Sequence, residues 1–315
     1  MKKHNILIVD DIESIRIAII DFLSSEYNVF SACNGIEALD ILKHTPIDMI
    51  ISDIRMPDMD GITFLTKVQK LYPTTKYALI TAYNINDYIQ YARHYKIWNI
   101  IPKSSFLDLQ FIKSMIYKLL SNDIFGFEKY FQDIKKISLK ISELYKYYKQ
   151  DDFILPQNTI YHIFVQSEEE REKVCDMIYI LFKKKEAPNI LRILLEEFSI
   201  NARDYGSDNF KKPIKIQFGL YDKKFLIGIN DYRGTLNFDE VLYRLERNIL
   251  TDKNGLPLSI NDIHGRGFFI ARENLDHLII NIKETEETEI LGIFDSDNEF
   301  RYKAISLYKI KPTSK

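Results

Sequence analysis

Four of the five short apolar runs in the first 120 residues end in polar side chains, and this pattern restricts the fold more than any other feature of the chain. Stretches with helical periodicity lie between the runs. Short buried strands that alternate with amphipathic helices are typical of a parallel sheet wound with helices on both faces. We therefore predict an α/β, doubly wound, five-stranded domain over residues 1–120. Its expected strands are 5–11, 28–32, 48–53, 76–81 and 99–103.

The polar residues at the ends of these strands form the first candidate site. Asp10 and Asp11 follow the first strand, Asp53 ends the third, Thr81 ends the fourth and Lys103 ends the fifth. The carboxyl ends of strands in such a sheet lie at one edge, so these side chains are expected to converge. Three crowded carboxylates require a cation, and oxygen ligands favour Mg²⁺. A lysine suits a phosphoryl group, and a carboxylate beside Mg²⁺ can attack phosphorus to form an acyl phosphate.

The stretch DMIISDIRMPDMDG at 48–61, together with these residues, resembles the receiver domain of two-component response regulators. The resemblance covers the whole first domain. It implies that Asp53 accepts a phosphoryl group from an upstream sensor histidine kinase. It also implies that Asp10, Asp11 and Asp53 bind Mg²⁺ together with the backbone carbonyl of Arg55.

The same resemblance assigns roles at the ends of the last two strands. Thr81 would hydrogen-bond a phosphoryl oxygen, and Lys103 would pair with the phosphoryl group. Two positions depart from the family, which usually has a proline after the lysine and an aromatic residue three positions before it. Here these positions hold Ser104 and Ile100. We therefore expect output through the helix after the last strand rather than through a threonine–aromatic switch.

Apolar residues recur at steps of three and four between residues 127 and 148, which gives a heptad pattern about three repeats long. The series is Phe127, Tyr130, Ile134, Ile137, Ile141, Leu144 and Tyr148. We predict a helical linker over 121–150 with two open interpretations. The helix either forms a parallel homodimer that carries signals between domains, or packs alone on a neighbouring domain.

Residues 151–315 show segregated strands and helices, which favours an α+β two-layer sandwich with helices on one face. A strand is expected at 161–166, helices at 168–185 and 189–204, and a hairpin at 215–221 and 225–231. A long polar segment spans 235–264, and a helix follows it. Two strand-like runs, ETEILGIF and YKAISLYKI, close the chain.

A second candidate site lies in this half. Glu197 and Asn201 are four residues apart in an expected helix and so share one face. The glutamate can act as a general base and the asparagine oxygen can bind Mg²⁺. Asp231 ends an apolar strand. Gly265 and Gly267 then precede a helix, where backbone N–H groups can approach a phosphate closely.

The order of these elements resembles the GHKL ATPase domain of histidine kinases, gyrase and Hsp90. EFSINARDYG and GRGFFIARENLDHL are most similar to the Asn box and second glycine box of the anti-sigma-factor serine kinases. The resemblance implies that the domain binds ATP. Asn201 would bind Mg²⁺, Glu197 would be the catalytic base and Asp231 would hydrogen-bond the adenine amine.

The resemblance also implies that Gly265, Arg266 and Gly267 surround the phosphates. The first glycine box normally reads Asp-x-Gly-x-Gly and departs from the family here. Arg233 stands in place of the first glycine, and Gly234 follows it as a binding candidate. An arginine there could crowd the adenine pocket or reach the phosphates.

These features predict a response regulator with an ATP-binding, serine-kinase-like output domain. Its partner would be a sigma factor or a STAS-type anti-sigma antagonist protein. The alternative is a non-enzymatic regulator that binds a partner through a degenerate nucleotide site. A hybrid histidine kinase ranks lower, because none of the six histidines lies within 127–148. They stand at positions 4, 44, 94, 162, 264 and 277.

Composition excludes several other classes. The formal net charge is −2, and we find no helix-turn-helix pattern, so nucleic acid is not an expected partner. No stretch approaches the roughly 20 apolar residues of a membrane helix. Cys33 and Cys175 lie in unrelated segments, and the N-terminus lacks the pattern of a secretory signal. We therefore expect a cytoplasmic protein without a membrane partner.

Overall fold

The computed structural model describes residues 3–81, 89–97, 99–102, 109–131, 133–256, 258, 266–297 and 304–310. The chain divides into two compact units, Met1–Ile124 and Phe125–Lys315. Within the described residues, no helix has the length and apolar character needed to cross a membrane.

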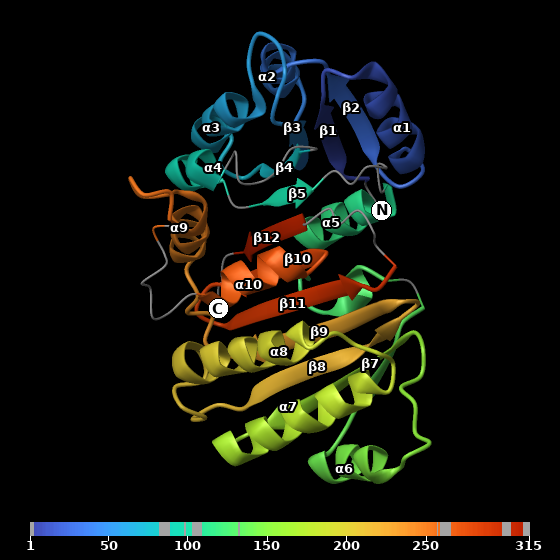
Figure 1. Cartoon of the computed structure of the whole chain (residues 1–315). Coiled ribbons are helices and arrows are strands. Elements are labelled where there is room, and N and C mark those ends of the chain that lie inside the picture. The colour runs from blue at the N-terminus through green and yellow to red at the C-terminus, as the bar shows by residue number, and fades with distance from the viewer. Residues whose placement is uncertain are drawn as a thin grey trace. The chain divides into compact units, whose positions relative to one another are not determined.

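The first unit alternates strands with helices around a parallel sheet of order β2-β1-β3-β4-β5 (Figure 1). Its elements are β1 (Asn5–Val9), α1 (Glu13–Leu23), β2 (Asn28–Ala32), α2 (Gly35–His44), β3 (Met49–Asp53), α3 (Gly61–Leu71), β4 (Lys76–Thr81), α4 (Ile89–Tyr95), β5 (Ile100–Pro102) and α5 (Leu109–Ser121). The predicted parallel α/β fold is therefore confirmed, with every expected strand present.

Side-chain caps fix where two of these helices begin. The Asn34 side chain accepts hydrogen bonds from two backbone N–H groups in the first turn of α2. The Asp60 carboxylate accepts one from the backbone N–H of Thr63 in α3, at 2.8 Å. Such caps satisfy donors that the helix itself leaves without a partner. Both helices start beside the carboxyl ends of the strands, so the caps also order the loops around the first candidate site.

The second unit is a mixed sheet of order β12-β10-β11-β9-β8-β7-β6. Neighbouring strands are antiparallel except for the β10/β12 and β6/β7 pairs. Its elements are η2 (Phe127–Lys129), β6 (Lys135–Ser138), α6 (Ile141–Lys149), β7 (Thr159–Val165), α7 (Glu168–Lys183), α8 (Ile190–Asn201), the π-helical turn η3 (Ala202–Gly206), β8 (Ile214–Tyr221), β9 (Lys224–Asp231), α9 (Phe238–Ile249), α10 (Arg266–Asn274), β10 (His277–Lys283), β11 (Glu287–Asp295) and β12 (Ala304–Ile310).

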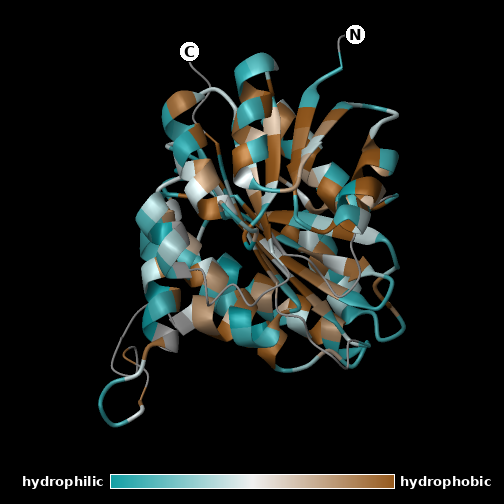
Figure 2. Cartoon of the chain, turned by 90° about the horizontal axis from the view of Figure 1, so that it is seen from above, coloured by the Kyte–Doolittle hydropathy of each residue, from teal (hydrophilic) through white to brown (hydrophobic). Residues whose placement is uncertain are grey.

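Helices α7, α8 and α10 lie along one face of this sheet (Figure 1). The strands are mostly hydrophobic along their length, whereas the helices carry hydrophobic and hydrophilic stretches (Figure 2). This distribution is expected where one face of each helix packs on a sheet and the other meets water. The second unit is therefore a mixed α/β structure with a helical layer on one face of a sheet.

The single heptad helix predicted for residues 127–148 is wrong. The segment instead forms the short helix η2, strand β6 and helix α6. Asp133 between the first two has a φ of 55°, a left-handed conformation that an α-helix does not contain. Lys135–Ser138 then pairs in parallel with β7. The apolar residues of the series are thus distributed over separate elements, and they form no continuous seam for a dimer.

Two further elements, one helix and one strand, were not predicted from the sequence. Helix α9 occupies part of the polar segment 235–264. Strand β10 follows α10 after two residues and pairs with both β11 and β12. Its sequence, HLIINIK, continues the apolar pattern of the preceding helix, so periodicity alone did not separate them.

Candidate functional site

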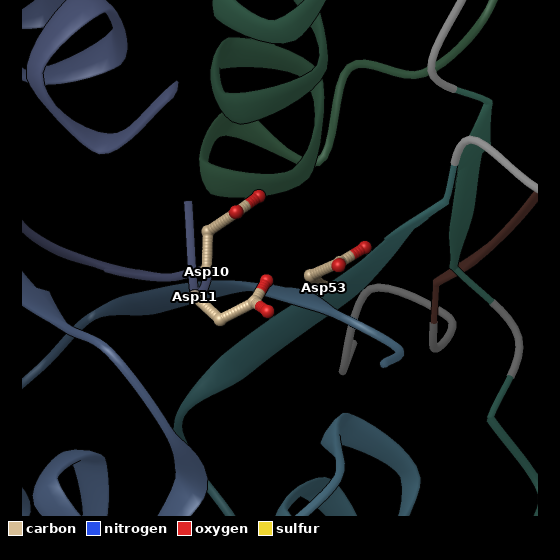
Figure 3. A group of neighbouring side chains, drawn as sticks. All are labelled: Asp10, Asp11 and Asp53. Carbon is tan, nitrogen blue, oxygen red and sulfur yellow. The ribbon is translucent and has the colours of Figure 1, made fainter. Parts of the chain in front are cut away.

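An acidic cluster lies at the carboxyl end of the first unit's sheet (Figure 3). It joins Asp10, Asp11 and Asp53, each of which contributes one carboxylate oxygen that lies within 4.8 Å of those of the other two. Asp10 and Asp53 are only 1% and 6% exposed, whereas Asp11 is exposed to solvent. Buried carboxylates this close repel each other strongly unless a cation lies between them. The cluster is therefore a site for a hard divalent cation such as Mg²⁺.

Strand pairing explains why these residues meet. β1 and β3 are neighbours in the sheet, so Asp10 and Asp53 reach the same edge. The backbone N–H of Asp10 donates to the carbonyl of Ala32, at 3.2 Å, which extends the pairing with β2. The carboxylate of Asp10 accepts a hydrogen bond from the backbone N–H of Ile12 at 3.0 Å. These contacts hold the Asp10 carboxylate beside that of Asp53.

The loop after β3 packs tightly against the predicted phosphoacceptor. A Cβ atom on Gly61 would lie 1.9 Å from the carbonyl oxygen of Asp53, so only glycine fits there. The backbone N–H of Gly61 donates to the carbonyl of Ile54 at 2.9 Å. This loop also contains Arg55, whose proposed carbonyl ligand to Mg²⁺ stays a prediction.

Thr81 lies at the same edge of the sheet, at the end of β4, and is 3% exposed. β4 is the direct neighbour of β3, and Asp53 is the register partner of Ile80. Thr81 is therefore the residue that follows the register partner of Asp53 on the adjacent strand. Lys103 and Ser104, which complete the predicted site, lie outside the described residues.

In the second unit, the predicted residues from α8 and α10 meet. A Cβ atom on Gly267 would lie 2.9 Å from Glu197 Oε2 and 3.5 Å from Asn201 Nδ2. The glycine lets the first turn of α10 approach the face of α8 that carries both side chains. Arg266 begins α10, but its side chain, like the whole of Gly265, lies outside the described residues.

Asp231 lies at the end of β9 and is 7% exposed. A Cβ atom on Gly206 would lie 2.1 Å from the Asp231 carboxyl carbon, so the π-helical turn approaches it directly. Burial raises the pKa of Asp231, and hydrogen bonds from the backbone N–H groups of Arg233 and Gly234 oppose this shift. Those two groups donate to Oδ1, at 3.1 and 3.4 Å.

Thr288 is a site residue that the sequence analysis missed. It is the register partner of Asp231 on the adjacent strand β11 and is 2% exposed. Its hydroxyl lies close enough to Asp231 to lower the pKa of that carboxyl, although it makes no hydrogen bond of good geometry among the described residues. Only knowledge of the strand register could have found it, because Thr288 lies 57 positions after Asp231 in the sequence.

Asn201, Asp231 and Thr288 all line one cavity of about 200 Å³. The cavity walls combine a few polar groups with a larger apolar surface, as in sites that bind small organic ligands. Its remaining lining residues are Ala202, Tyr205, Ile229, Thr235, Leu236, Asn237, Glu240, Val241, Arg244, Phe268 and Ile290. The residues contributed by α9 and the loop before it were also missed by the sequence analysis.

Arg233 and Gly234 of the first glycine box lie outside the described lining of this cavity. Arg233 is 41% exposed, and its Nη1 lies 3.8 Å from Asp208 Oδ2. Gly234 has a φ of 58°, and a Cβ atom there would lie 2.3 Å from the carbonyl oxygen of Lys283. The arginine is therefore directed to a surface ion pair, and the glycine is needed for packing against the β10–β11 turn.

Comparison with known proteins supports the assignment of the first unit. Residues 6–115 match the family model of the response regulator receiver domain. Sporulation initiation phosphotransferase F from Bacillus subtilis (strain 168) is 37% identical over 91 residues, which are 29% of this chain and 73% of that protein. The DNA-binding transcriptional regulator NtrC from Proteus hauseri is 34% identical over 112 residues, 34% of this chain but only 23% of that protein.

Solved structures include a similar domain. The signal receiver domain of an HD domain-containing protein from Pseudomonas fluorescens Pf-5 is 28% identical, with a TM-score of 0.36. The alignment covers 38% of this chain and 97% of that chain.

The chain belongs to the response regulator family, and its first unit is a receiver domain. It is therefore a component of two-component signal transduction. Receiver domains are phosphorylated by upstream histidine kinases and bind Mg²⁺ at an acidic pocket, which is the chemistry that the Asp10, Asp11 and Asp53 cluster allows.

Proposed function

We propose that phosphorylation of Asp53 controls a nucleotide-binding output domain in the second unit. Asp10 and Asp11 would hold Mg²⁺ beside Asp53, while Thr81 and Lys103 would stabilise the phosphoryl group. The Asp53 carboxylate would attack the phosphorus of the incoming phosphoryl group, and the leaving group would depart with the bonding electrons. The close approach of the three carboxylates supports this role for the first unit.

The output domain would bind Mg-ATP in the cavity of the second unit. One observation carries this part of the proposal: Asn201 and Asp231, from different elements, line the same cavity, and Gly267 lies against Asn201. Asn201 would bind Mg²⁺ and Asp231 would accept a hydrogen bond from the adenine amine. Gly265, Arg266 and Gly267 would offer backbone N–H groups to the phosphates at the start of α10. The position of Arg233 beside Asp208 leaves the described part of the cavity open to such a ligand.

We further infer that the output domain is a serine kinase of the anti-sigma type. Glu197, whose carboxylate lies against Gly267, would act as the general base on a serine hydroxyl of the partner. The γ-phosphoryl group would pass from ATP to that oxygen, leaving ADP. The partner would be a sigma factor or a STAS-type antagonist protein.

A non-enzymatic output is the second candidate. One observation favours it: Glu197 is not among the described residues that line the cavity. In that case the second unit would bind its partner in a nucleotide-dependent or nucleotide-free state without transferring phosphate.

Calorimetric titration with Mg-ATP and a kinase assay together test these proposals. We expect Mg-ATP to bind, and γ-labelled ATP to transfer label to a STAS-type substrate at a rate that changes when the receiver is phosphorylated. Binding without transfer, in both receiver states, would favour the non-enzymatic candidate. Absence of nucleotide binding would overturn the ATP proposal, while labelling of Asp53 would still test the receiver separately.

A further inference from the structure

A carboxylate is buried on the face of the second sheet that is turned away from the cavity. Successive side chains of a strand point to opposite faces, so Glu289 faces away from the cavity that Thr288 lines. Glu289 is fully buried. Its Oε1 accepts hydrogen bonds from Gln217 Nε2 at 2.8 Å and from Asn230 Nδ2 at 3.1 Å. Asn230 is on the adjacent strand β9, and Gln217 is on β8, one strand further away.

The other oxygen of this carboxylate binds a different part of the chain. Oε2 of Glu289 accepts hydrogen bonds from Asn281 Nδ2 and from the backbone N–H of Gly126, both at 2.9 Å. A buried carboxylate is stable only when such donors replace its lost water. The Gly126 donor belongs to no strand of the sheet, so Glu289 connects the sheet to the segment that precedes it.

We call Gly126–Phe131 the docking segment. Phe127 is fully buried, and a Cβ atom on Gly228 of β9 would lie 3.1 Å from its ring. The Phe131 ring lies 4.4 Å from that of Tyr221 on β8, measured between centroids. Burial also raises the pKa of Tyr130 well above its ordinary value. The docking segment therefore covers the face of the sheet opposite the cavity.

Strand register connects this contact to the cavity. Glu289 is the register partner of Asn230, and Thr288 is the register partner of Asp231. The two pairs are adjacent rungs of the β9–β11 ladder, one facing the docking segment and the other facing the cavity. Because sheet neighbours are closely packed, a shift of β11 against β9 at one rung must displace the other.

The docking segment also lies directly after the receiver unit in the chain. Gly126 follows the end of α5, Ser121, by five residues. The Lys76 side chain at the start of β4 donates to the carbonyl oxygen of Leu119 and to Asn122 Oδ1, the latter at 2.7 Å. The connection is thus held by hydrogen bonds on its receiver side at Asn122 and on its output side at Gly126.

We propose that Glu289 is a positioning residue through which the docking segment regulates the cavity of the second unit. The docked segment holds β9 and β11 in the register that places Asp231 and Thr288 side by side, and so favours ligand binding. Linkage requires the reverse effect, so a bound ligand stabilises the docked segment. The inference rests on the proposed binding of Mg-ATP in this cavity.

Hydrogen exchange of the full chain, with and without saturating Mg-ATP, tests this coupling. We expect Mg-ATP to slow exchange in the docking segment by about fivefold or more, the lower end of typical coupling between sites. Glu289→Gln should remove this effect and weaken Mg-ATP binding by a similar factor. The glutamine replaces one acceptor oxygen with an NH2 group, which cannot accept hydrogen bonds from the donors that surround Glu289. Saturation is verified for each variant by calorimetry.

Glu287→Gln is the matched control. Glu287 is on the same strand and face and also accepts a hydrogen bond from Asn230 Nδ2, at 2.7 Å. Glu289 alone of the two is hydrogen-bonded to Gly126 among the described residues. We therefore expect Glu287→Gln to retain the effect of Mg-ATP on the docking segment. If the hydrogen-bond network had only a structural role, Glu287→Gln and Glu289→Gln would change the effect of Mg-ATP on exchange in the docking segment equally, and the inference would be overturned.

A second variant disturbs the contact from the other side. Gly126 has a φ of 96°, and a Cβ atom there would lie 2.2 Å from Glu128 Oε2. Gly126→Ala should therefore displace the docking segment without changing the sheet, and it replaces Glu289→Gln if that variant does not fold. Mg-ATP that binds the wild type but leaves exchange in the docking segment unchanged would overturn the inference alone. Failure of the wild type to bind Mg-ATP would overturn the proposed nucleotide site as well.

Discussion

The two units use buried carboxylates in opposite ways. In the receiver, Asp10, Asp11 and Asp53 approach one another within 4.8 Å and together attract a cation. In the second unit, burial raises the pKa of Asp231, and its Oδ1 already accepts hydrogen bonds from two backbone N–H groups. Asp231 is therefore suited to accept a hydrogen bond from a neutral donor group, the role proposed for it with the adenine amine. The difference teaches that carboxylates in close contact with one another favour a cation, whereas a carboxylate that accepts backbone hydrogen bonds is stabilised without one.

The largest effect is expected in the receiver. Asp53→Asn should abolish labelling by acetyl phosphate or by a cognate histidine kinase, because an amide cannot form the acyl phosphate. Asp58→Asn is a suitable control, since Asp58 is exposed in the following loop with a φ of 63°, which asparagine also adopts. Mass spectrometry of the intact protein measures the label. Labelling that persists in Asp53→Asn would place the acceptor elsewhere.

The next largest effect concerns the second site. Asn201→Ala should weaken Mg-ATP binding by at least about tenfold, or ~1.4 kcal/mol, if its side chain binds the metal. Asn189→Ala, at the other end of α8, removes the oxygen that accepts a hydrogen bond from the Tyr179 hydroxyl and should leave the affinity unchanged. Calorimetry in Mg²⁺ and again in EDTA measures both. An equal loss for both variants would indicate damage to α8 rather than a lost ligand.

A smaller, pH-dependent effect separates the two kinds of carboxylate. The folded-state pKa of Asp231 is raised above the ordinary value of 3.8, so its contribution to stability is complete below pH 3.8 and is lost as the pH rises through the folded-state pKa. Asp231→Asn stays neutral and should melt at a higher temperature than the wild type at pH 7. It should also bind Mg-ATP more weakly, because its amide nitrogen cannot accept a hydrogen bond.

Asp208 is a natural comparison for this experiment. Its pKa is lowered, chiefly by the hydrogen bond from Lys211, so its contribution is instead lost as the pH falls. We would measure melting temperatures of Asp231→Asn and Asp208→Asn from below pH 3.8 to pH 7. As the pH rises, the difference in melting temperature from the wild type should change in opposite directions for the two variants. Identical pH profiles for Asp231→Asn and the wild type would refute the effect assigned to burial.

The smallest effect is expected at Arg233. Because its guanidinium forms an exposed ion pair with Asp208, Arg233→Gln should change the unfolding free energy by no more than about 1 kcal/mol. Affinity for Mg-ATP should change by less than about twofold, or ~0.4 kcal/mol. A large rise in affinity on substitution would mean that the arginine enters the cavity in solution.

The receiver fold and the convergence of its acidic residues could be predicted from local sequence patterns. Four of its five expected strands end at a polar residue, and parallel strands present their carboxyl ends at one edge. Asp10, Asp11 and Asp53 needed only that rule to be brought together. The cavity of the second unit needed more, because Thr288 and Glu240 reach it through strand pairing and helix packing that no local pattern encodes.

The incorrect heptad helix has a physical explanation. Spacing of three and four describes one face of a helix, but it also arises when apolar anchors are spread over a turn, a strand and a short helix. Phe127 and Leu144 are fully buried as the pattern required, yet they belong to η2 and α6. The pattern correctly identified residues that lie in a core, but it assigned them to the wrong secondary structure.

The π-helical turn Ala202–Gly206 gives the second site a property that substitutions alone would not reveal. Its closing hydrogen bond, 2.7 Å long, runs from the N–H of Ser207 to the carbonyl of Ala202. This bond joins residues five apart, whereas an α-helical bond joins residues four apart. The position of Gly206 against Asp231 therefore depends on chain length as well as residue identity. Deleting one residue from the turn would restore α-helical spacing and rotate everything after it by about 100°.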